Sequence, residues 1–184
     1  MTLKDITDGQ FAAQQIGGIN PIKGTDLYAQ LSQDNKQILQ YSFKTGKQTA
    51  ILFDVNNTQG EHIDKFDGYI MSPDGRHILI ATKRQNVYRR SYKAVFYIYT
   101  VQSRKLERLS DCGPQQDPVW SQDGNQVAFV RDNNIFLVKL LYGNSESQVT
   151  KDGKMNEVIN GIPDWVNEEE FGFNSALVFT ADGS

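Results

Sequence analysis

A four-residue motif that reads Ser-x-Asp-Gly or Ser-x-Asp-Asn recurs along the chain and limits its fold more than any other feature. Three full copies and a weaker copy that begins with Thr occur at Ser32–Asn35, Ser72–Gly75, Ser121–Gly124 and Thr180–Gly183. An apolar residue precedes each copy, and an alternating or apolar stretch follows the first three. Asp-Gly and Asp-Asn tolerate the positive φ that tight turns between antiparallel strands require. The motif therefore predicts a series of β-hairpins.

The third copy is followed by the clearest set of predicted strands. Residues 127–131 and Ile135–Leu140 have the pattern of strands around a turn at 132–134, and Ser147–Thr150 has the pattern of a short outer strand. With Pro118–Trp120 in front, the unit contains four short antiparallel strands. The motif copies begin 40, 49 and 59 residues apart. Four-stranded units at this spacing are typical of β-propeller blades.

We therefore expect an all-β chain that forms a partial β-propeller of about four blades, each a four-stranded antiparallel sheet. The predicted blades are roughly 25–66, 67–111, 112–155 and an incomplete 156–184. A β-sandwich with similar turns is the alternative, and the apolar residue shared by all motif copies favours the propeller. The strongest helix signal is Asp164–Gly172, because an aspartate suits the cap and glutamates favour the first turn.

The composition excludes several classes of protein. The 184 residues carry a net charge of −3, which argues against a general nucleic-acid-binding protein with a strong basic field. No apolar run approaches the ~18 residues that a membrane-spanning helix needs. Cys112 is the single cysteine, so an internal disulfide and a cysteine-rich metal site are both excluded.

The sequence lacks the patterns of a complete catalytic centre. Its two histidines are His62, in a polar loop, and His77, in a predicted strand. No Gly-x-Ser-x-Gly nucleophile elbow occurs, and neither do the zinc-protease, EF-hand, Walker and dinucleotide-binding patterns. We therefore expect these residues to use no cofactor and no metal, and to carry out no hydrolysis by themselves.

An acidic segment at residues 160–171 is the first candidate site. It contains three adjacent carboxylates, Glu168, Glu169 and Glu170. Like charges that are confined together repel, so a site that confines them needs a cation, and an ammonium group offers three donors. The alternative is a solvated acidic turn or helix start, which composition alone favours. Trp165, beside the carboxylates, is a residue type found more often in a core than in a site.

A basic segment, Lys83–Tyr92, is the second candidate site. It lies between the predicted strands Ile78–Ala81 and Val95–Tyr99 and carries four basic residues and two tyrosines. Arginine presents a planar fork of donors that suits carboxylates and carbonyl oxygens. A solvated hairpin tip is the alternative that the segment alone favours. A small nucleic-acid patch is a further alternative, which the overall charge disfavours.

Together the two segments resemble the dipeptidyl peptidase IV family of serine peptidases, in the prolyl oligopeptidase clan. Residues 164–170, Asp-Trp-Val-Asn-Glu-Glu-Glu, resemble the Asp-Trp-Val-Tyr-Glu-Glu-Glu motif of the family. Residues 88–92, Tyr-Arg-Arg-Ser-Tyr, resemble its Trp-Arg-His-Ser-Tyr stretch, and residues 95–101 are similar to its next strand. The resemblance extends from Leu3 to Ser184.

The resemblance implies a fold and a function. In this family an eight-bladed propeller covers an α/β-hydrolase domain, which holds the catalytic serine, aspartate and histidine. The enzymes remove X-Pro or X-Ala dipeptides from the N-terminus of a peptide. By motif position, Glu169 and Glu170 would bind the substrate α-amine, and Arg89 would bind a substrate carbonyl oxygen. The chain would then be the N-terminal propeller part of such an enzyme, without its later blades and without its C-terminal hydrolase domain.

Three positions depart from the pattern of the family. Asn167 stands where the family has Tyr, so the packing beside the glutamates is expected to differ while the carboxylates are retained. Tyr88 and Arg90 stand where the family has Trp and His, and a surface loop tolerates both changes.

The resemblance also implies a location and partners. By the resemblance we expect a periplasmic or extracellular enzyme. Residues 1–10 contain no apolar signal-peptide core, so its signal segment would lie outside this sequence. The final residues, 181–184, have the pattern of half a turn, so we expect the propeller to be cut within a blade. The expected partners are peptides with a free N-terminus, the hydrolase domain and a second copy of the full-length enzyme, but no nucleic acid. A non-enzymatic propeller that binds other proteins is the alternative, since propellers host many functions.

Overall fold

The computed structural model describes residues 2–8 and 18–181, and β-strands dominate these ranges. Two short α-helices occur, α1 (Leu3–Thr7) and α2 (Trp165–Phe171). The sequence did not predict α1. Neither helix is long and apolar enough to cross a membrane. The predicted turn at Asp182–Ser184 lies outside the described residues, so it stays a prediction.

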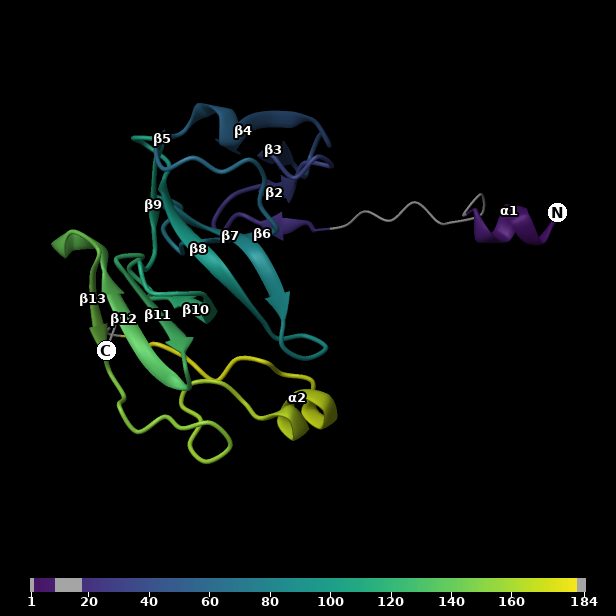
Figure 1. Cartoon of the computed structure of the whole chain (residues 1–184). Coiled ribbons are helices and arrows are strands. Elements are labelled where there is room, and N and C mark those ends of the chain that lie inside the picture. The colour runs from purple at the N-terminus through teal and green to yellow at the C-terminus, as the bar shows by residue number, and fades with distance from the viewer. Residues whose placement is uncertain (1, 9–17, 182–184) are drawn as a thin grey trace.

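The first sheet is antiparallel and has the strand order β1-β2-β3-β4. Its strands are β1 (Asn20–Pro21), β2 (Leu27–Leu31), β3 (Gln37–Ser42) and β4 (Gln48–Asp54). A 3₁₀ turn, Val55–Asn57, leads from β4 toward the second sheet. Consecutive strands are neighbours, as the hairpin motif predicts (Figure 1).

The remaining nine strands form one continuous sheet, in which two groups of consecutive strands meet where β8 pairs with β10. The first group comprises β5 (Gln59–Gly60), β6 (Gly68–Met71), β7 (His77–Asn86), β8 (Tyr92–Thr100) and β9 (Lys105–Arg108). The second comprises β10 (Gln115–Trp120), β11 (Gln126–Arg131), β12 (Asn134–Lys139) and β13 (Ser145–Gln148). A 3₁₀ turn, Leu140–Tyr142, separates β12 from β13. The β5–β9 pairing is parallel and the other pairings of this sheet are antiparallel.

The all-β prediction is confirmed, and strands form where the third motif copy predicts them. The turn between β11 and β12 is tighter than predicted, because Asp132 and Asn133 both adopt positive φ and Asn134 already pairs with Arg131. The predicted blade boundaries stay a prediction. Within 156–181 the structure contains α2 and no strand.

The serine motif makes the same turn three times. In each full copy the serine Oγ donates to the aspartate Oδ1 over 2.6 Å. The same serine oxygen accepts the backbone N–H of the residue five positions later over 2.8–2.9 Å. The fourth residue adopts positive φ: 57° at Asn35, 71° at Gly75 and 70° at Gly124. Each motif therefore satisfies its own polar groups, which is why the hairpins predicted from it form.

The second and third of these turns also contact each other. Arg76 pairs with the carboxylate of Asp74 in its own turn. Its Nη2 atom donates to the carbonyl oxygen of Asp123 and to Oδ1 of Asn125, each over 3.3 Å. A Cβ atom at Gly124 would lie 2.7 Å from the Asp74 carboxylate. Glycine at this position therefore permits both the positive φ and the close approach of the neighbouring turn.

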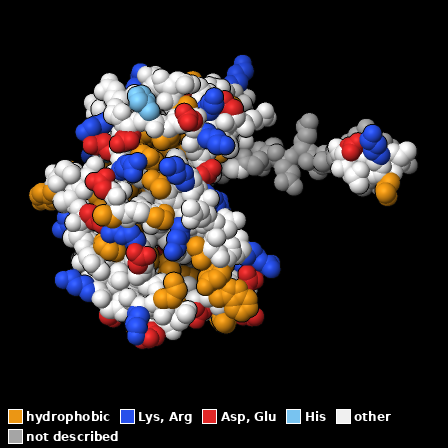
Figure 2. Space-filling model, in the orientation of Figure 1, with side chains coloured by type: hydrophobic (Ala, Val, Ile, Leu, Met, Phe, Trp, Pro, Cys, Tyr) orange, Lys and Arg blue, Asp and Glu red, His pale blue; other side chains and the backbone are white. Residues whose placement is uncertain are grey.

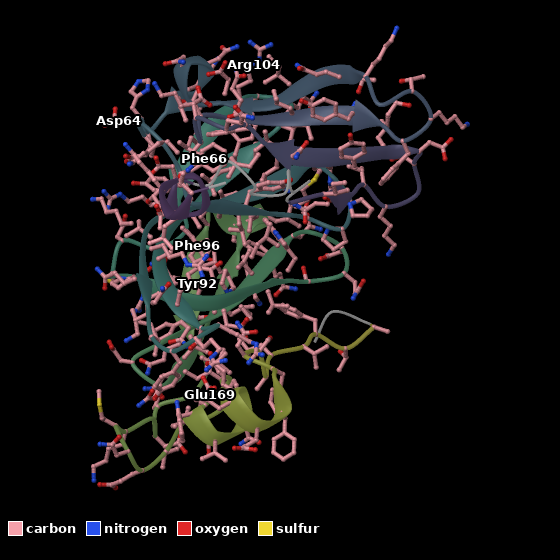
Figure 3. The ribbon with its side chains drawn as sticks, turned by 90° about the vertical axis from the view of Figure 1, so that its right-hand side faces the viewer. Asp64, Phe66, Tyr92, Phe96, Arg104 and Glu169 are labelled. Carbon is pink, nitrogen blue, oxygen red and sulfur yellow. The ribbon has the colours of Figure 1, made fainter. Side chains whose placement is uncertain are left out.

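The group of strands from β6 to β9 supplies side chains to two apolar clusters, because successive residues of a strand point to opposite faces. One cluster lies against the first sheet and contains Ala29, Ile38, Phe53, Val55, Phe66, Ile78, Ile80, Tyr97, Tyr99 and Leu106. The other lies against β10–β12 and contains Leu79, Ala81, Ala94, Phe96, Ile98, Leu109, Trp120, Val127, Phe129, Phe136 and Val138. Figure 3 marks Phe66 in the first cluster and Phe96 in the second. The sheets are thus stacked face to face around the middle group.

Candidate functional site

The basic segment forms the tip of the β7–β8 hairpin. The two strands have ten and nine residues and are the longest in the described part of the chain. The predicted strand Ile78–Ala81 is too short, because β7 continues to Asn86 beyond a register shift in which Lys83 adopts a φ of 54°. The backbone N–H of Val87 donates to the Ser91 carbonyl over 2.9 Å and closes the tip. The tip of this long hairpin approaches α2 (Figure 1).

The acidic segment forms α2, and the predicted helix Asp164–Gly172 is confirmed. Asp164 caps its N-terminus by accepting the backbone N–H of Asn167 over 2.8 Å, and Gly172 ends it with a φ of 76°. Asn167, which departs from the family pattern, also donates from Nδ2 to Asp164 Oδ1 over 3.0 Å. Asn167 thus adds a second bond at the cap. Since successive helical residues are about 100° apart, the three glutamates point in different directions.

Glu168 is the buried member of the three glutamates. This residue is only 1% exposed. Its Oε1 atom accepts the backbone N–H of Arg90 over 2.6 Å and that of Ser91 over 3.0 Å. In return, Nη1 of Arg90 donates to the Glu168 carbonyl over 3.0 Å. Three hydrogen bonds thus join α2 to the hairpin tip.

The electrostatics of this contact favour an ionised carboxylate. Burial by itself raises the pKa of Glu168, but hydrogen bonds from Ser91 and Arg90 and the positive charge of Arg90 outweigh it. The pKa of Glu168 therefore lies below its ordinary value. The charge of this carboxylate is compensated within the protein.

Arg89 and Glu169 come together at the edge of the same contact. The Arg89 Nε atom lies 3.4 Å from Glu169 Oε2, and the two side chains are 72% and 21% exposed. In Figure 3, Glu169 lies on the side of α2 that faces strand β8, which carries Tyr92 and Phe96. The structure thus places two of the three predicted site residues side by side, although 80 positions separate them in the sequence.

Glu170, the third predicted site residue, is exposed and directly follows Glu169 on α2. Hydrophobic side chains gather over α2 (Figure 2), and the exposed large hydrophobic residues of this helix are Trp165, Val166 and Phe171, of which Trp165 is 55% exposed. The expectation that Trp165 belongs to a core is therefore wrong for the described residues. The hydrogen bonds that join α2 to the hairpin tip all involve Glu168, and Trp165 in the first turn of this short helix stays exposed.

A small polar cavity lies behind the hairpin tip. It has a volume of about 100 Å³ and is lined by Ile70, Ser91, Tyr92, Gln116, Asp117, Pro118 and Asn174. Asp117 adopts a φ of 50° within a bulge of β10. Burial raises the pKa of Asp117 above its ordinary value, against hydrogen bonds from Ser175 and Ala176. Asp117 therefore links β10 to the segment that follows α2.

The sequence selected Arg89, Glu169 and Glu170 as site residues, named Glu168 only as one of three adjacent carboxylates, and gave no sign of Asp117. Nothing in a run of three glutamates tells which one is buried, because that depends on how the helix docks. Within residues 2–8 and 18–181, no group of three or more His, Cys, Asp or Glu side chains could hold a metal ion. The arrangement suits a ligand that carries a cationic group next to a hydrogen-bond acceptor.

A four-stranded sheet packed against a nine-stranded sheet of consecutive hairpins, with a charged hairpin tip at its edge, is the arrangement of a β-propeller segment. A family model described as the dipeptidyl peptidase IV (DPP IV) N-terminal region matches residues 72–184. The chain belongs to this family, which confirms the resemblance noted in the sequence.

Comparisons with individual proteins agree. The crystal structure of Porphyromonas gingivalis dipeptidyl peptidase 4 is similar with a TM-score of 0.94 and 38% identity, and the match covers 100% of this chain and 26% of that chain. Human prolyl endopeptidase FAP is 35% identical over 171 residues, or 92% of this chain and 21% of that protein. A probable dipeptidyl peptidase 4 of Aspergillus fumigatus is 42% identical over 119 residues, or 63% of this chain and 15% of that protein. The chain thus spans about a quarter or less of the length of these relatives.

The structural likeness also confirms the partial propeller as the fold class. The roles of Arg89, Glu169 and Glu170 are not tested by any of these comparisons and stay predictions.

Proposed function

We propose that the chain is the substrate-recognition part of a dipeptidyl peptidase IV-like serine exopeptidase that releases X-Pro and X-Ala dipeptides. Membership of the family and relatives named as dipeptidyl peptidases support this reaction class. The observation that carries the proposal is the 3.4 Å approach of Arg89 Nε to Glu169 Oε2, with Glu170 as the next residue of α2. A donor for the carbonyl oxygen and acceptors for the α-amine of the first residue of a peptide therefore lie next to each other.

In this proposal Glu169 and Glu170 accept hydrogen bonds from the α-ammonium group of the substrate. Two carboxylates suit one ammonium group, which has three N–H donors. Arg89 donates to the carbonyl oxygen of the first substrate residue. Its guanidinium has five N–H donors, so contact of Nε with Glu169 leaves donors for the substrate.

Such a site determines the length of the product. Because the amine is fixed against the carboxylates, the scissile bond lies at a set distance from it along the peptide. Binding energy at the amine then places that bond against a nucleophile, which raises the rate by orientation. The catalytic serine, aspartate and histidine would come from a hydrolase domain outside this sequence, so the 184 residues alone are expected to be inactive.

The proposal extends to the setting of the full-length enzyme. An exopeptidase that acts on extracellular or periplasmic peptides fits the resemblance, as does a homodimer of the full-length protein. Peptides with a free N-terminus are the proposed ligands, without a metal or an organic cofactor.

The test is the turnover of a free-amine X-Pro chromogenic substrate by the full-length protein. Glu169→Ala or Glu170→Ala should each lower kcat/KM by tenfold or more, which corresponds to about 1.4 kcal/mol of transition-state binding. Removal of one carboxylate leaves the other alone against the cation.

Glu157→Ala is the matched control, because Glu157 is an exposed glutamate that pairs with Lys154 away from the hairpin tip. Its kcat/KM should equal that of the wild type. Turnover at the wild-type level in both Glu169 and Glu170 variants would reject the amine-binding role. A full-length protein with no hydrolytic activity would instead favour the alternative of a protein-binding propeller.

A further inference from the structure

Glu168 joins the immediate neighbours of the residues proposed to bind substrate. Its carboxylate accepts the backbone N–H groups of Arg90 and Ser91, which directly follow Arg89. Glu169 directly follows Glu168 on α2. The hydrogen bonds at Glu168 therefore lie one residue away from Arg89 on one side and one residue away from Glu169 on the other.

We propose that Glu168 is a positioning residue that sets the separation between Arg89 and Glu169 and thereby the affinity for the substrate α-amine. This inference rests on the proposed function, because it assigns a role at the same site. It differs from that proposal in the residue and in the action: Glu168 contacts protein backbone and not the ligand.

The geometry supports a fixed separation. The contact consists of two bonds to backbone N–H groups, of 2.6 and 3.0 Å, and a return bond of 3.0 Å from Arg90 Nη1 to the Glu168 carbonyl. Bonds that run in both directions between two short segments restrict sliding as well as rotation. Charge-assisted hydrogen bonds of this kind are shorter and stronger than neutral ones.

Burial and charge separate Glu168 from its two neighbours. Glu168 is 1% exposed, whereas the Glu169 side chain is 21% exposed and Glu170 lies in the exposed class. The charge of Glu168 is compensated by Arg90 and by the two N–H groups, so this carboxylate does not compete for the ligand cation. Of three adjacent glutamates, one therefore orders the site and two remain for the amine.

Other parts of the contact cannot replace Glu168. The Arg89–Glu169 pair is separated by 3.4 Å and the Arg89 side chain is 72% exposed, so this pair is weak by itself. Without Glu168, the buried N–H of Ser91 and the part-buried N–H of Arg90 would lack their acceptor, and the hairpin tip would move away to hydrate them. Arg89 would move with it.

The first test measures kcat/KM of the full-length protein with a free-amine X-Pro substrate, at a temperature well below thermal unfolding. Glu168→Ala should lower kcat/KM at least tenfold, whereas Glu168→Gln, which keeps an oxygen acceptor, should lose less. Glu157→Ala serves again as the exposed glutamate control. Equal activity of Glu168→Ala and wild type would overturn the inference.

A double-substitution cycle separates positioning from a general structural role. If Glu168 acts through Glu169, then Glu168→Ala should reduce kcat/KM less than threefold once Glu169→Ala is already present. If Glu168→Ala lowers kcat/KM by the same factor with and without Glu169→Ala, then Glu168 does not act through Glu169. This result would overturn the inference.

Hydrogen exchange of the full-length protein distinguishes this inference from the proposed function. Glu168→Ala should accelerate amide exchange in residues 87–91, and Glu169→Ala should not. Unchanged exchange in the Glu168 variant would overturn the positioning role. If the exchange rates change as expected but Glu169→Ala retains full activity, the amine-binding proposal fails and the positioning role fails with it, although the contact itself exists.

Discussion

The serine-motif turns and the Arg89–Glu169 site use similar hydrogen bonds over very different sequence distances. In the turns, the serine and aspartate side chains bond to partners two to five positions away. At the site, Glu168 bonds to residues 77 and 78 positions earlier. A turn therefore closes with its own residues, whereas the site needs the long β7–β8 hairpin and α2 in their correct places. The comparison explains why one could be predicted from a short motif and the other could not.

The largest expected effect tests whether the turns are as self-contained as this comparison implies. Gly75 and Gly124 both adopt positive φ, of 71° and 70°, and a Cβ atom at Gly75 would meet nothing within 4 Å. Gly75→Ala should therefore lower the free energy of unfolding by about 1–2 kcal/mol, through backbone strain alone. Gly124→Ala should cost about 2–4 kcal/mol, because its Cβ also meets the Asp74 carboxylate.

Denaturant unfolding of the two variants provides the measurement. Gly75→Ala is the matched control, since it has the same motif position and the same backbone conformation. Equal losses in both variants would mean that the contact between neighbouring turns contributes nothing, and each turn would be independent.

The next effect concerns Ser121, whose hydroxyl donates to Asp123 and accepts the N–H of Gln126. Ser121→Ala should lower the free energy of unfolding by about 1 kcal/mol, because it removes both of these hydrogen bonds. The hydrogen bond from Ser121 is the main cause that lowers the pKa of Asp123 to about 2. In the variant, this pKa should rise toward its ordinary value.

The pH dependence follows from the sign of that shift. A carboxyl group whose pKa is lowered by folding stabilises the folded state above its unfolded pKa, and this contribution is lost as the pH falls through the folded pKa. The difference in stability between wild type and Ser121→Ala should therefore shrink as the pH falls from about 4 to about 2. Carboxyl chemical shifts of Asp123 report the pKa, and an unchanged value in Ser121→Ala would contradict the assigned cause.

The smallest expected effect on stability is at the site itself. Arg89→Ala removes a side chain that is 72% exposed and one loose ion pair, so the free energy of unfolding should change by less than about 0.5 kcal/mol. Turnover of the full-length enzyme should fall nonetheless if Arg89 binds the substrate carbonyl. A large decrease in the thermal midpoint would assign Arg89 a structural role. The site would then contribute to stability as the serine-motif turns do.

The sequence was informative where local chemistry decides the structure. The serine motif predicted three turns because its polar side chains are satisfied within six residues, and Asp164 and Gly172 predicted the limits of α2 through capping. The family resemblance selected Arg89, Glu169 and Glu170. It selected them by their positions in the motifs, without information on the distances between them in the folded chain.

The rest depends on contacts between distant segments. No local pattern identifies Glu168 as the buried glutamate, because its partners Arg90 and Ser91 belong to another hairpin. The predicted end of β7 was wrong because pairing with β8 continues past the bulge at Lys83 into a polar stretch. Trp165 was expected in a core, but it is 55% exposed on a helix whose hydrogen bonds to the hairpin tip run through Glu168.

The shared middle group of strands has a consequence for how the molecule unfolds. Ile78 and Ile80 pack toward the first sheet, while Leu79, which lies between them in β7, packs toward β10–β12. Opening this strand therefore exposes both apolar clusters at once. The two clusters cannot lose their structure one after the other without a large free-energy cost, so the stacked sheets are coupled into one cooperative unit.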